Sequence, residues 1–159
     1  MSVPAVLDTC VLYPMYLRRA LVREGAASSD QAERIITLMR VHFPESEVAG
    51  YESLTVTMTC HPKDRHVLAA AVKAGSALLV TDNNDDFPPE STEPYGVEVL
   101  TSDQFLLELL DASPATVIRT LGRQAERYKR DPKTLDGLLT SLSRAGVRNF
   151  ADEVRRLIP

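Results

Sequence analysis

Apolar residues between positions 62 and 81 follow first a helical and then a strand pattern. Pro62 suits the first turn of the predicted helix, because the N–H that proline lacks has no helical partner there. Gly75 is placed to end this helix in a left-handed conformation. The wholly apolar run at 77–81 predicts a strand buried on both faces, as in parallel sheets. The buried face of the helix is expected to comprise Val67, Leu68, Ala71 and Val72.

The N-terminal part of the chain opens with the same kind of strand. Residues 3–7 form a short apolar run, and Asp8 stands at its end. The threonine-rich stretch 51–60 shows no clear periodicity and is predicted to be irregular. The other elements predicted in this part are helices at 16–25 and about 28–42 and a short strand at 47–50.

The last third of the chain is predicted to be mainly helical. A loop with three prolines at 88–96 precedes an edge strand at 97–100. Thr101 and Gln104 have the spacing of a capping box, which favours a helix start. Apolar stripes on these helices are predicted to be packing surfaces, which could also hold a partner or a second copy of the chain. The predicted helices span 101–110, 113–128, 131–146 and 150–158.

Length and composition are those of a globular domain. The 159 residues suffice for one domain with its own core, and 44% are hydrophobic and 25% charged. No apolar run reaches membrane-spanning length, and no basic region precedes the first one, so we expect neither a membrane anchor nor a secretory signal. Cys10 and Cys60 lack zinc-site spacing and are interpreted as structural thiols, which fit a reducing cytoplasm.

The net charge of −4 argues against binding nucleic acid by bulk electrostatic attraction. Contact with RNA would need a local basic patch or a metal ion. Arg18, Arg19 and Arg23 on one predicted helix are interpreted first as a solvated face and second as a phosphate-contacting patch near the mouth of the site. A second basic face, on the helix predicted at 113–128 and just beyond it, comprises Arg119, Arg123, Arg127, Lys129 and Arg130.

Carboxylates follow or precede the two predicted parallel strands. Asp8 ends the first strand, Asp64 lies at the start of the helix, and an acidic cluster at 82–86 follows the second strand. Ligands of open α/β sheets bind beyond the carboxyl ends of the strands, so these groups could converge there. Converging carboxylates repel one another unless a hard cation such as Mg²⁺ or Mn²⁺ neutralises them. Each also has an ordinary interpretation, as a turn or cap residue, a helix-dipole partner or a hydrated loop.

Four motifs together resemble the PIN-domain family, in particular VapC-type toxins with a helical C-terminal extension. They are V-L-D-T-C-V-L-Y-P at 6–14, K-D-R-H-V-L-A-A-A at 63–71, V-T-D-N-N-D-D-F-P at 80–88 and P-Y-G-V-E-V-L-T-S-D-Q-F-L at 94–106. The resemblance implies an α/β class with a three-layer α/β/α PIN-like fold and a short parallel sheet. It implies a PIN-like domain at 1–110 and a helical extension at 111–159 packed on it.

The resemblance also implies a site and an activity. Asp8, Asp64 and Asp86 would hold Mg²⁺ or Mn²⁺, and Asn83 would complete the catalytic set as a neutral oxygen ligand or water holder. The implied activity is metal-dependent cleavage of RNA by the toxin of a toxin–antitoxin pair. Partners would be RNA, a cognate antitoxin and a second copy of the chain, in the cytoplasm and without a membrane.

The sequence departs from the family pattern near residues 17–20. A PIN domain of this branch would carry a helix, a strand and an acidic helix between V-L-Y-P and the helix containing Q-A-E-R-I-I. Here Leu17 runs almost directly into Arg19, as if a segment had been skipped. One acidic ligand would then be absent, or a neighbouring chain would supply it by domain exchange.

Two other functions stay open from the sequence. A degenerate PIN fold could bind a partner or oligomerise without cleaving RNA, which the skipped segment favours. A phosphatase of the haloacid-dehalogenase type would also begin with a strand ending in Asp. That family places a second acidic residue two positions later, where this chain has Cys10.

Overall fold

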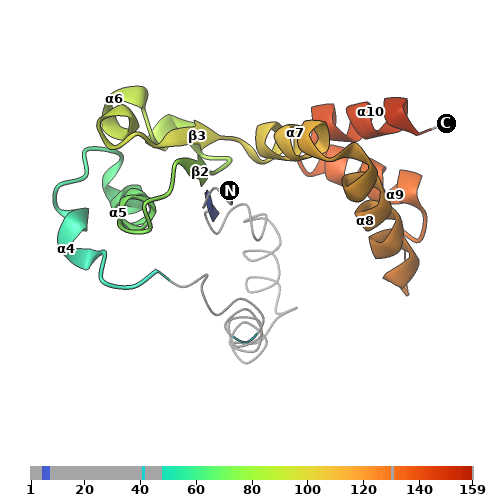
Figure 1. Ribbon diagram of the computed structural model, residues 1–159, viewed down its shortest axis with the longest axis horizontal. Coiled ribbons are helices and arrows are strands. Elements are labelled where there is room, and N and C mark those ends of the chain that lie inside the picture. The colour runs from blue at the N-terminus through green and yellow to red at the C-terminus, as the bar shows by residue number, and fades with distance from the viewer. Residues whose placement is uncertain (1–4, 8–40, 42–47, 130, 159) are drawn as a thin grey trace. The chain divides into compact units, whose positions relative to one another are not determined.

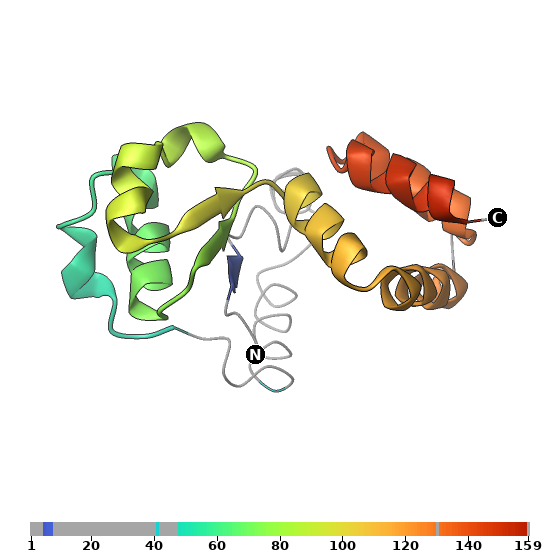
Figure 2. The ribbon, with the colours of Figure 1, turned by 45° about the horizontal axis from the view of Figure 1, so that its top comes forward.

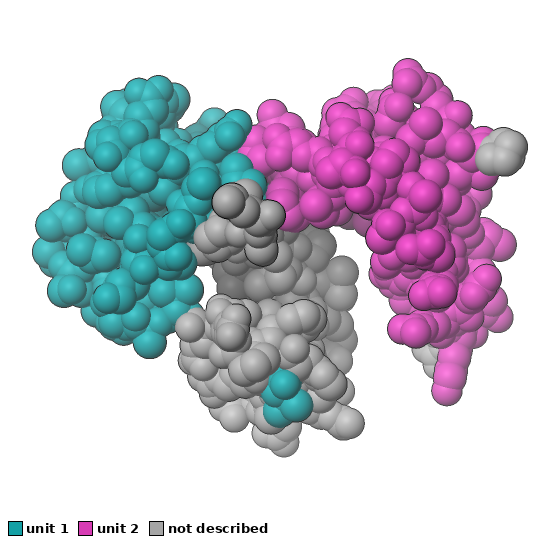
Figure 3. Space-filling model, in the orientation of Figure 1, with its two compact units in different colours: residues 1–99 teal, residues 100–159 magenta. Residues whose placement is uncertain are grey.

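The structure is a computed structural model that describes residues 5–7, 41, 48–129 and 131–158 (Figure 1). The helix predicted at 16–25, all but residue 41 of the helix predicted at about 28–42, residue Asp8 and the junction at 17–20 lie outside the described residues. The chain forms two compact units, residues 1–99 and 100–159 (Figure 3).

A small sheet organises the first unit. Its strands are β1 (Ala5–Leu7), β2 (Leu78–Val80) and β3 (Glu98–Leu100), in the order β1-β2-β3. β1 and β2 run parallel, with Leu7 opposite Val80. Val80 is fully buried, as expected of a strand covered on both faces. The predicted parallel pair is confirmed, and the chain has an α/β fold; the three-layer arrangement stays a prediction.

The predicted central helix is present as two consecutive pieces. A 3-10 turn, η1 (Pro62–Asp64), leads into α5 (Arg65–Lys73), with Pro62 at the first position. Gly75 ends the helix at φ +63°, and the amide of Ser76 donates to the carbonyl of Ala71 at 3.0 Å. This left-handed ending was predicted. Figure 2 shows α5 alongside the sheet. Its buried face packs in a core of Met58, Cys60, Val67, Leu68, Ala69, Ala71, Leu79, Phe87 and Val97.

Two stretches predicted to lack structure contain short helical turns. The region 51–60 includes α4 (Glu52–Thr55), and the proline-rich loop includes α6 (Pro89–Thr92) and η3 (Glu93–Tyr95). Proline is favoured at the start of such turns, but four residues are too few to show a hydrophobic period. The acidic stretch after β2 likewise contains a 3-10 turn, η2 (Asn84–Asp86).

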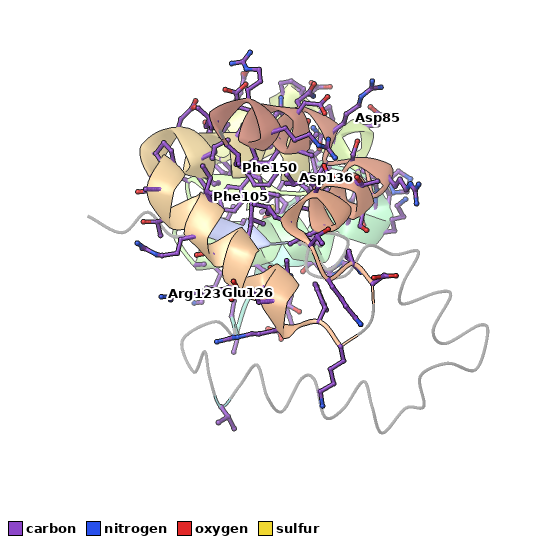
Figure 4. All side chains as sticks on the ribbon, turned by 90° about the vertical axis from the view of Figure 1, so that its right-hand side faces the viewer. Asp85, Phe105, Arg123, Glu126, Asp136 and Phe150 are labelled. Atoms are coloured by element: carbon purple, nitrogen blue, oxygen red, sulfur yellow. The ribbon has the colours of Figure 1, made fainter. Side chains whose placement is uncertain are left out.

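The second unit is built from four described helices around one core. They are α7 (Ser102–Ala112), α8 (Pro114–Arg127), α9 (Leu135–Arg144) and α10 (Arg148–Leu157). Figure 4 shows Phe150, which is 1% exposed, among these helices. α7 belongs to this second unit, and the predicted PIN-like domain at 1–110 stays a prediction. The core comprises Leu110, Leu139, Val147, Phe150, Ala151 and Val154.

Helix starts in this unit follow local hydrogen bonding. The capping box of Thr101 and Gln104 is confirmed, with both reciprocal bonds present. The predicted start of the third helix at Asp131 was wrong, because α9 begins at Leu135. Thr134 provides the cap there, its hydroxyl accepting from the amide of Gly137 at 3.1 Å. Among the described residues, no helix is both long and apolar enough to cross a membrane.

Candidate metal centre

Three side chains from two separate segments converge beyond the end of β2. His61 directly precedes the η1 turn, Asp64 ends it, and Asp86 ends η2. One ligand atom from each lies within 4.8 Å of the other two. Asp64 and Asp86 are partly buried, whereas His61 is exposed. The cluster therefore has two carboxylates on its inner side and one imidazole towards solvent.

The backbone fixes the two segments against each other. The amide of His61 donates to the carbonyl of Asp86 at 2.9 Å, and the amide of Asp64 donates to the carbonyl of His61 at 2.9 Å. These bonds tie the entry of the central helix to the loop that follows β2. The carboxylates are thus held close by main-chain contacts that do not depend on their own charge.

Lys63 brings a positive charge between the two carboxylates. Its Nζ lies 2.9 Å from Oδ2 of Asp86 and 3.8 Å from Oδ2 of Asp64. The Lys63 side chain is 59% exposed, so its charge remains largely hydrated. Repulsion between Asp64 and Asp86 is consequently offset within the chain itself.

Asn83 and Thr81 support the carboxylate of Asp86. The hydroxyl of Thr81, at the end of β2, accepts from the amide of Asn83 at 3.1 Å. The side-chain amide nitrogen of Asn83 donates to Oδ2 of Asp86. Asn83 thereby orients Asp86 as a hydrogen-bond donor; its predicted role as a neutral oxygen ligand or water holder stays a prediction.

These contacts favour the charged form of Asp86. The hydrogen bond from Lys63 is the largest cause that lowers the pKa of Asp86 below its ordinary 3.8, while partial desolvation opposes it. The positive charges of Lys63 and His61 act in the same direction as the Lys63 bond. Asp86 is therefore ionised at any pH near neutrality.

Comparison with known proteins identifies the family. A family model described as the VapC50 C-terminal domain matches residues 102–156. The chain is 38% identical over 110 residues to "Putative ribonuclease VapC50" of Mycobacterium tuberculosis, an alignment that covers 69% of this chain and 64% of that protein. The chain is a VapC-like PIN-domain protein. It thus spans less than two thirds of the curated relative it matches. No solved structure matches the chain.

The structure brings together part of the predicted site of this VapC-like protein. Asp64 and Asp86 lie side by side, and Asn83 contacts Asp86. Asp8 lies outside the described residues. Asp82 and Asp85, which were expected to be variable positions, are exposed and belong to no metal-binding group among the residues described.

Sequence reasoning missed His61 and Lys63. Both lie in the segment that precedes the central helix. Pro62 stands between them, so this segment shows no simple helical spacing of residues. The backbone bond from His61 to Asp86 brings His61 to the acidic loop, and its Nδ1 lies 4.0 Å from Oδ1 of Asp86. A basic residue directly before a predicted metal ligand was the available signal for Lys63.

The donor set of the VapC-like chain fits a hard divalent ion. Carboxylate oxygens are the ligands that Mg²⁺ and Mn²⁺ prefer, and such ions bind few side chains and several waters. The 4.8 Å span of the cluster only slightly exceeds the ~4.2 Å between opposite ligands at ~2.1 Å. The Lys63 ammonium lies at both carboxylates and would have to withdraw for an ion to bind there.

Proposed function

We propose that this chain is a metal-dependent RNA endonuclease and the toxin of a toxin–antitoxin pair. The observation that carries the proposal is the convergence of Asp64 and Asp86 beyond β2, from segments 22 residues apart in the chain. The relative named as a ribonuclease gives independent support. The comparisons give no support to the phosphatase alternative.

Each residue of the site has a distinct role in this proposal. Asp64 and Asp86 would hold Mg²⁺ or Mn²⁺, and Asn83 would keep the Asp86 carboxylate in position. Asp8 is the third proposed ligand, because it directly follows Leu7, which pairs with Val80 at the end of β2. A bound divalent ion supplies Lewis-acid chemistry, stabilising charge on the phosphate and making water a better nucleophile.

The proposal extends to the setting of the reaction. RNA is the substrate class, a cognate antitoxin is a partner, and a homodimer is the proposed assembly. The two-cysteine composition supports a cytoplasmic site of action. A three-layer α/β/α PIN-like domain with a helical extension is the architecture that we propose for the whole chain.

The test is cleavage of a labelled single-stranded RNA in Mn²⁺, in Mg²⁺ and in chelator. We expect cutting only with metal, and a fall of about a hundredfold in Asp86→Asn and in Asp64→Asn, equivalent to ~2.7 kcal/mol of transition-state stabilisation. Asp8→Asn tests the third ligand in the same way.

Asp85→Asn is the matched control. Asp85 belongs to the same acidic turn and carries the same charge, but it is exposed and outside the cluster. We expect this variant to cut as the parent does. Equal losses of cleavage in Asp85→Asn and Asp86→Asn would show that the effect depends on the negative charge of the turn alone. That result would contradict the assigned site.

A second candidate function is a binding module without cleavage. It is favoured by Lys63, whose ammonium group already offsets the charge of the two carboxylates. In that case a folded parent protein would bind RNA or a protein partner and show no metal-dependent cutting.

A further inference from the structure

The outer face of α8 carries a row of arginines. Arg119, Arg123 and Arg127 follow one another at intervals of four residues, and all three are exposed. The opposite face of the helix is apolar and faces the core of the second unit. At a rise of ~1.5 Å per residue, successive arginines in this row are ~6 Å apart along the helix. The inward-facing residues are Val117, Ile118, Leu121 and Ala125.

The three arginines of this row form no ion pair within the part of the chain that the structure describes. Arg119 makes a 3.5 Å contact with the hydroxyl of Thr116. Like charges four residues apart destabilise a helix by about 0.2–0.5 kcal/mol per pair. Glu126, which Figure 4 shows on the same helix beside Arg123, is the single acidic residue of α8. The row is therefore a cost to the fold in the absence of an anionic partner.

The arginines of α10 show the contrasting arrangement. Arg148 pairs with Asp152 at 3.8 Å, and Arg156 pairs with Glu153 at 2.8 Å. Arg155 contacts two carboxylates, those of Asp136 and Asp152. The same unit thus neutralises one set of arginines within the chain and leaves the α8 row available.

The charge of the chain is divided unevenly between its units. Residues 100–159 contain ten Lys and Arg and eight Asp and Glu, a net charge of +2, whereas residues 1–99 carry −6. The overall acidic balance therefore hides a basic surface in the C-terminal unit. Local positive charge of this kind is what binds a phosphate backbone.

An aromatic ring stands at the end of the arginine row. Tyr128 directly follows α8 and is 41% exposed, and its hydroxyl accepts a hydrogen bond from Nε2 of Gln124 at 3.0 Å. Arginines beside an exposed aromatic ring are the usual means of holding single-stranded nucleic acid, by phosphate contact and base stacking. A protein partner would more often cover an apolar centre. None of the exposed large hydrophobic residues that the structure describes lies on α8 itself.

We propose that Arg119, Arg123 and Arg127 with Tyr128 form a binding surface for single-stranded RNA. The arginines contact successive phosphates, and the ring of Tyr128 stacks on a base. This inference rests on the proposed RNA cleavage in choosing RNA as the anion, but the contacts involve no residue of the metal centre. The surface supplies the RNA affinity that the net charge of the whole chain does not provide.

The test is fluorescence anisotropy of a labelled single-stranded RNA with the full chain in chelator, where cleavage cannot occur. We expect Arg119→Gln/Arg123→Gln to raise Kd at least about tenfold. The plot of log K against log salt should become shallower by about 1.4, because each lost phosphate contact removes about 0.7. Tyr128→Leu should weaken binding about tenfold without changing that salt slope, since stacking carries no charge.

Arg148→Gln/Arg156→Gln is the charge-matched control. It removes the same two charges from exposed positions of the same unit, and we expect Kd to change by no more than about twofold. Equal losses in the two double variants, or an unchanged salt slope in the α8 variant, would overturn the proposal. An α8 variant that binds RNA normally but changes sedimentation would assign this face to protein contact and also overturn it.

The two proposals can fail separately. Asp86→Asn should retain parent-like RNA affinity in chelator if α8 holds the RNA. RNA binding that depends on α8, together with an absence of metal-dependent cutting, would refute the proposed nuclease and leave the α8 surface intact. Metal-dependent cutting that is abolished in Asp86→Asn, together with an RNA affinity that the α8 substitutions leave unchanged, would refute only the proposed α8 surface.

Discussion

The carboxylate of Asp103, in the first turn of α7, accepts a hydrogen bond from the amide of Phe150 in the first turn of α10 at 2.9 Å. The other oxygen of Asp103 accepts from the amide of Asn149 at 3.2 Å and from its side chain at 2.6 Å. Val147 occupies the cap position of α10 and has no side-chain acceptor. Asp103, which lies 47 positions before Phe150 in the sequence, thus caps this helix.

We predict that Asp103→Ala lowers the free energy of unfolding by about 1–3 kcal/mol, because two amides would lose their acceptor in a largely buried place. Asp103→Asn keeps one acceptor oxygen and should cost less. Urea unfolding followed by circular dichroism measures both changes. A free energy of unfolding in Asp103→Ala equal to that of the parent would show that water replaces the cap without cost.

This cap marks the limit of what the sequence predicts about the fold. Local signals succeeded where the determining residues are neighbours, as in the capping box of Thr101 and Gln104 and the left-handed ending at Gly75. They failed at Asp131, because proline after it suggested a helix start that Thr134 provides instead. The bond from Asp103 to α10 joins positions far apart in the chain, and no local pattern contains it.

The same distinction holds for the metal centre. Their places beside the central helix and the second strand indicated Asp64 and the acidic cluster at 82–86, and the family resemblance singled out Asp86. The structure brings Asp64 and Asp86 together. His61 and Lys63 were not predicted as site residues. Their approach to Asp86 depends on the backbone bond from His61 and on the reach of the Lys63 side chain. Tertiary contacts of this kind leave no periodic trace in the sequence.

We predict that Gly75→Ala destabilises the chain by about 1 kcal/mol. A Cβ at Gly75 would meet no atom within 4 Å, so the cost is the left-handed backbone at φ +63° alone. Gly122→Ala is the matched control. A Cβ at Gly122 would also meet no atom within 4 Å, but this residue lies inside α8 and has no positive φ. That change should stabilise by about 0.5–1 kcal/mol. Thermal or urea unfolding of both variants checks the two opposite signs.

We predict that Lys63→Met tightens Mn²⁺ binding by up to about fivefold, because the ion no longer competes with the ammonium group between Asp64 and Asp86. The same variant should unfold more easily in chelator, since the two carboxylates lose their counter-charge. Isothermal titration with Mn²⁺ and thermal unfolding give the two readouts. Lys73→Met, at the exposed end of α5, is the control and should change neither. Weaker Mn²⁺ binding in Lys63→Met would contradict this prediction and indicate that the lysine holds Asp64 and Asp86 in position for the ion.

We predict a pH dependence of stability in the metal-free protein that requires Lys63. The hydrogen bond from Lys63 lowers the pKa of folded Asp86 below its ordinary 3.8. The unfolded chain therefore binds more protons in this range, and the free energy of unfolding rises with pH. The Asp86 contribution is fully present above the ordinary pKa and is lost as pH falls through the lowered one.

Urea midpoints measured between about pH 5 and pH 3 test this dependence. We expect the parent and Lys73→Met to lose stability along parallel curves as pH falls. Lys63→Met should lose less, since its Asp86 would have a pKa closer to that of the unfolded chain. If Lys63→Met ran parallel to the parent over the whole range, the contact between Lys63 and Asp86 would not hold the carboxylate in its ionised form. The remaining contacts of Asp86, with Asn83 and His61, would then have to account for its ionisation.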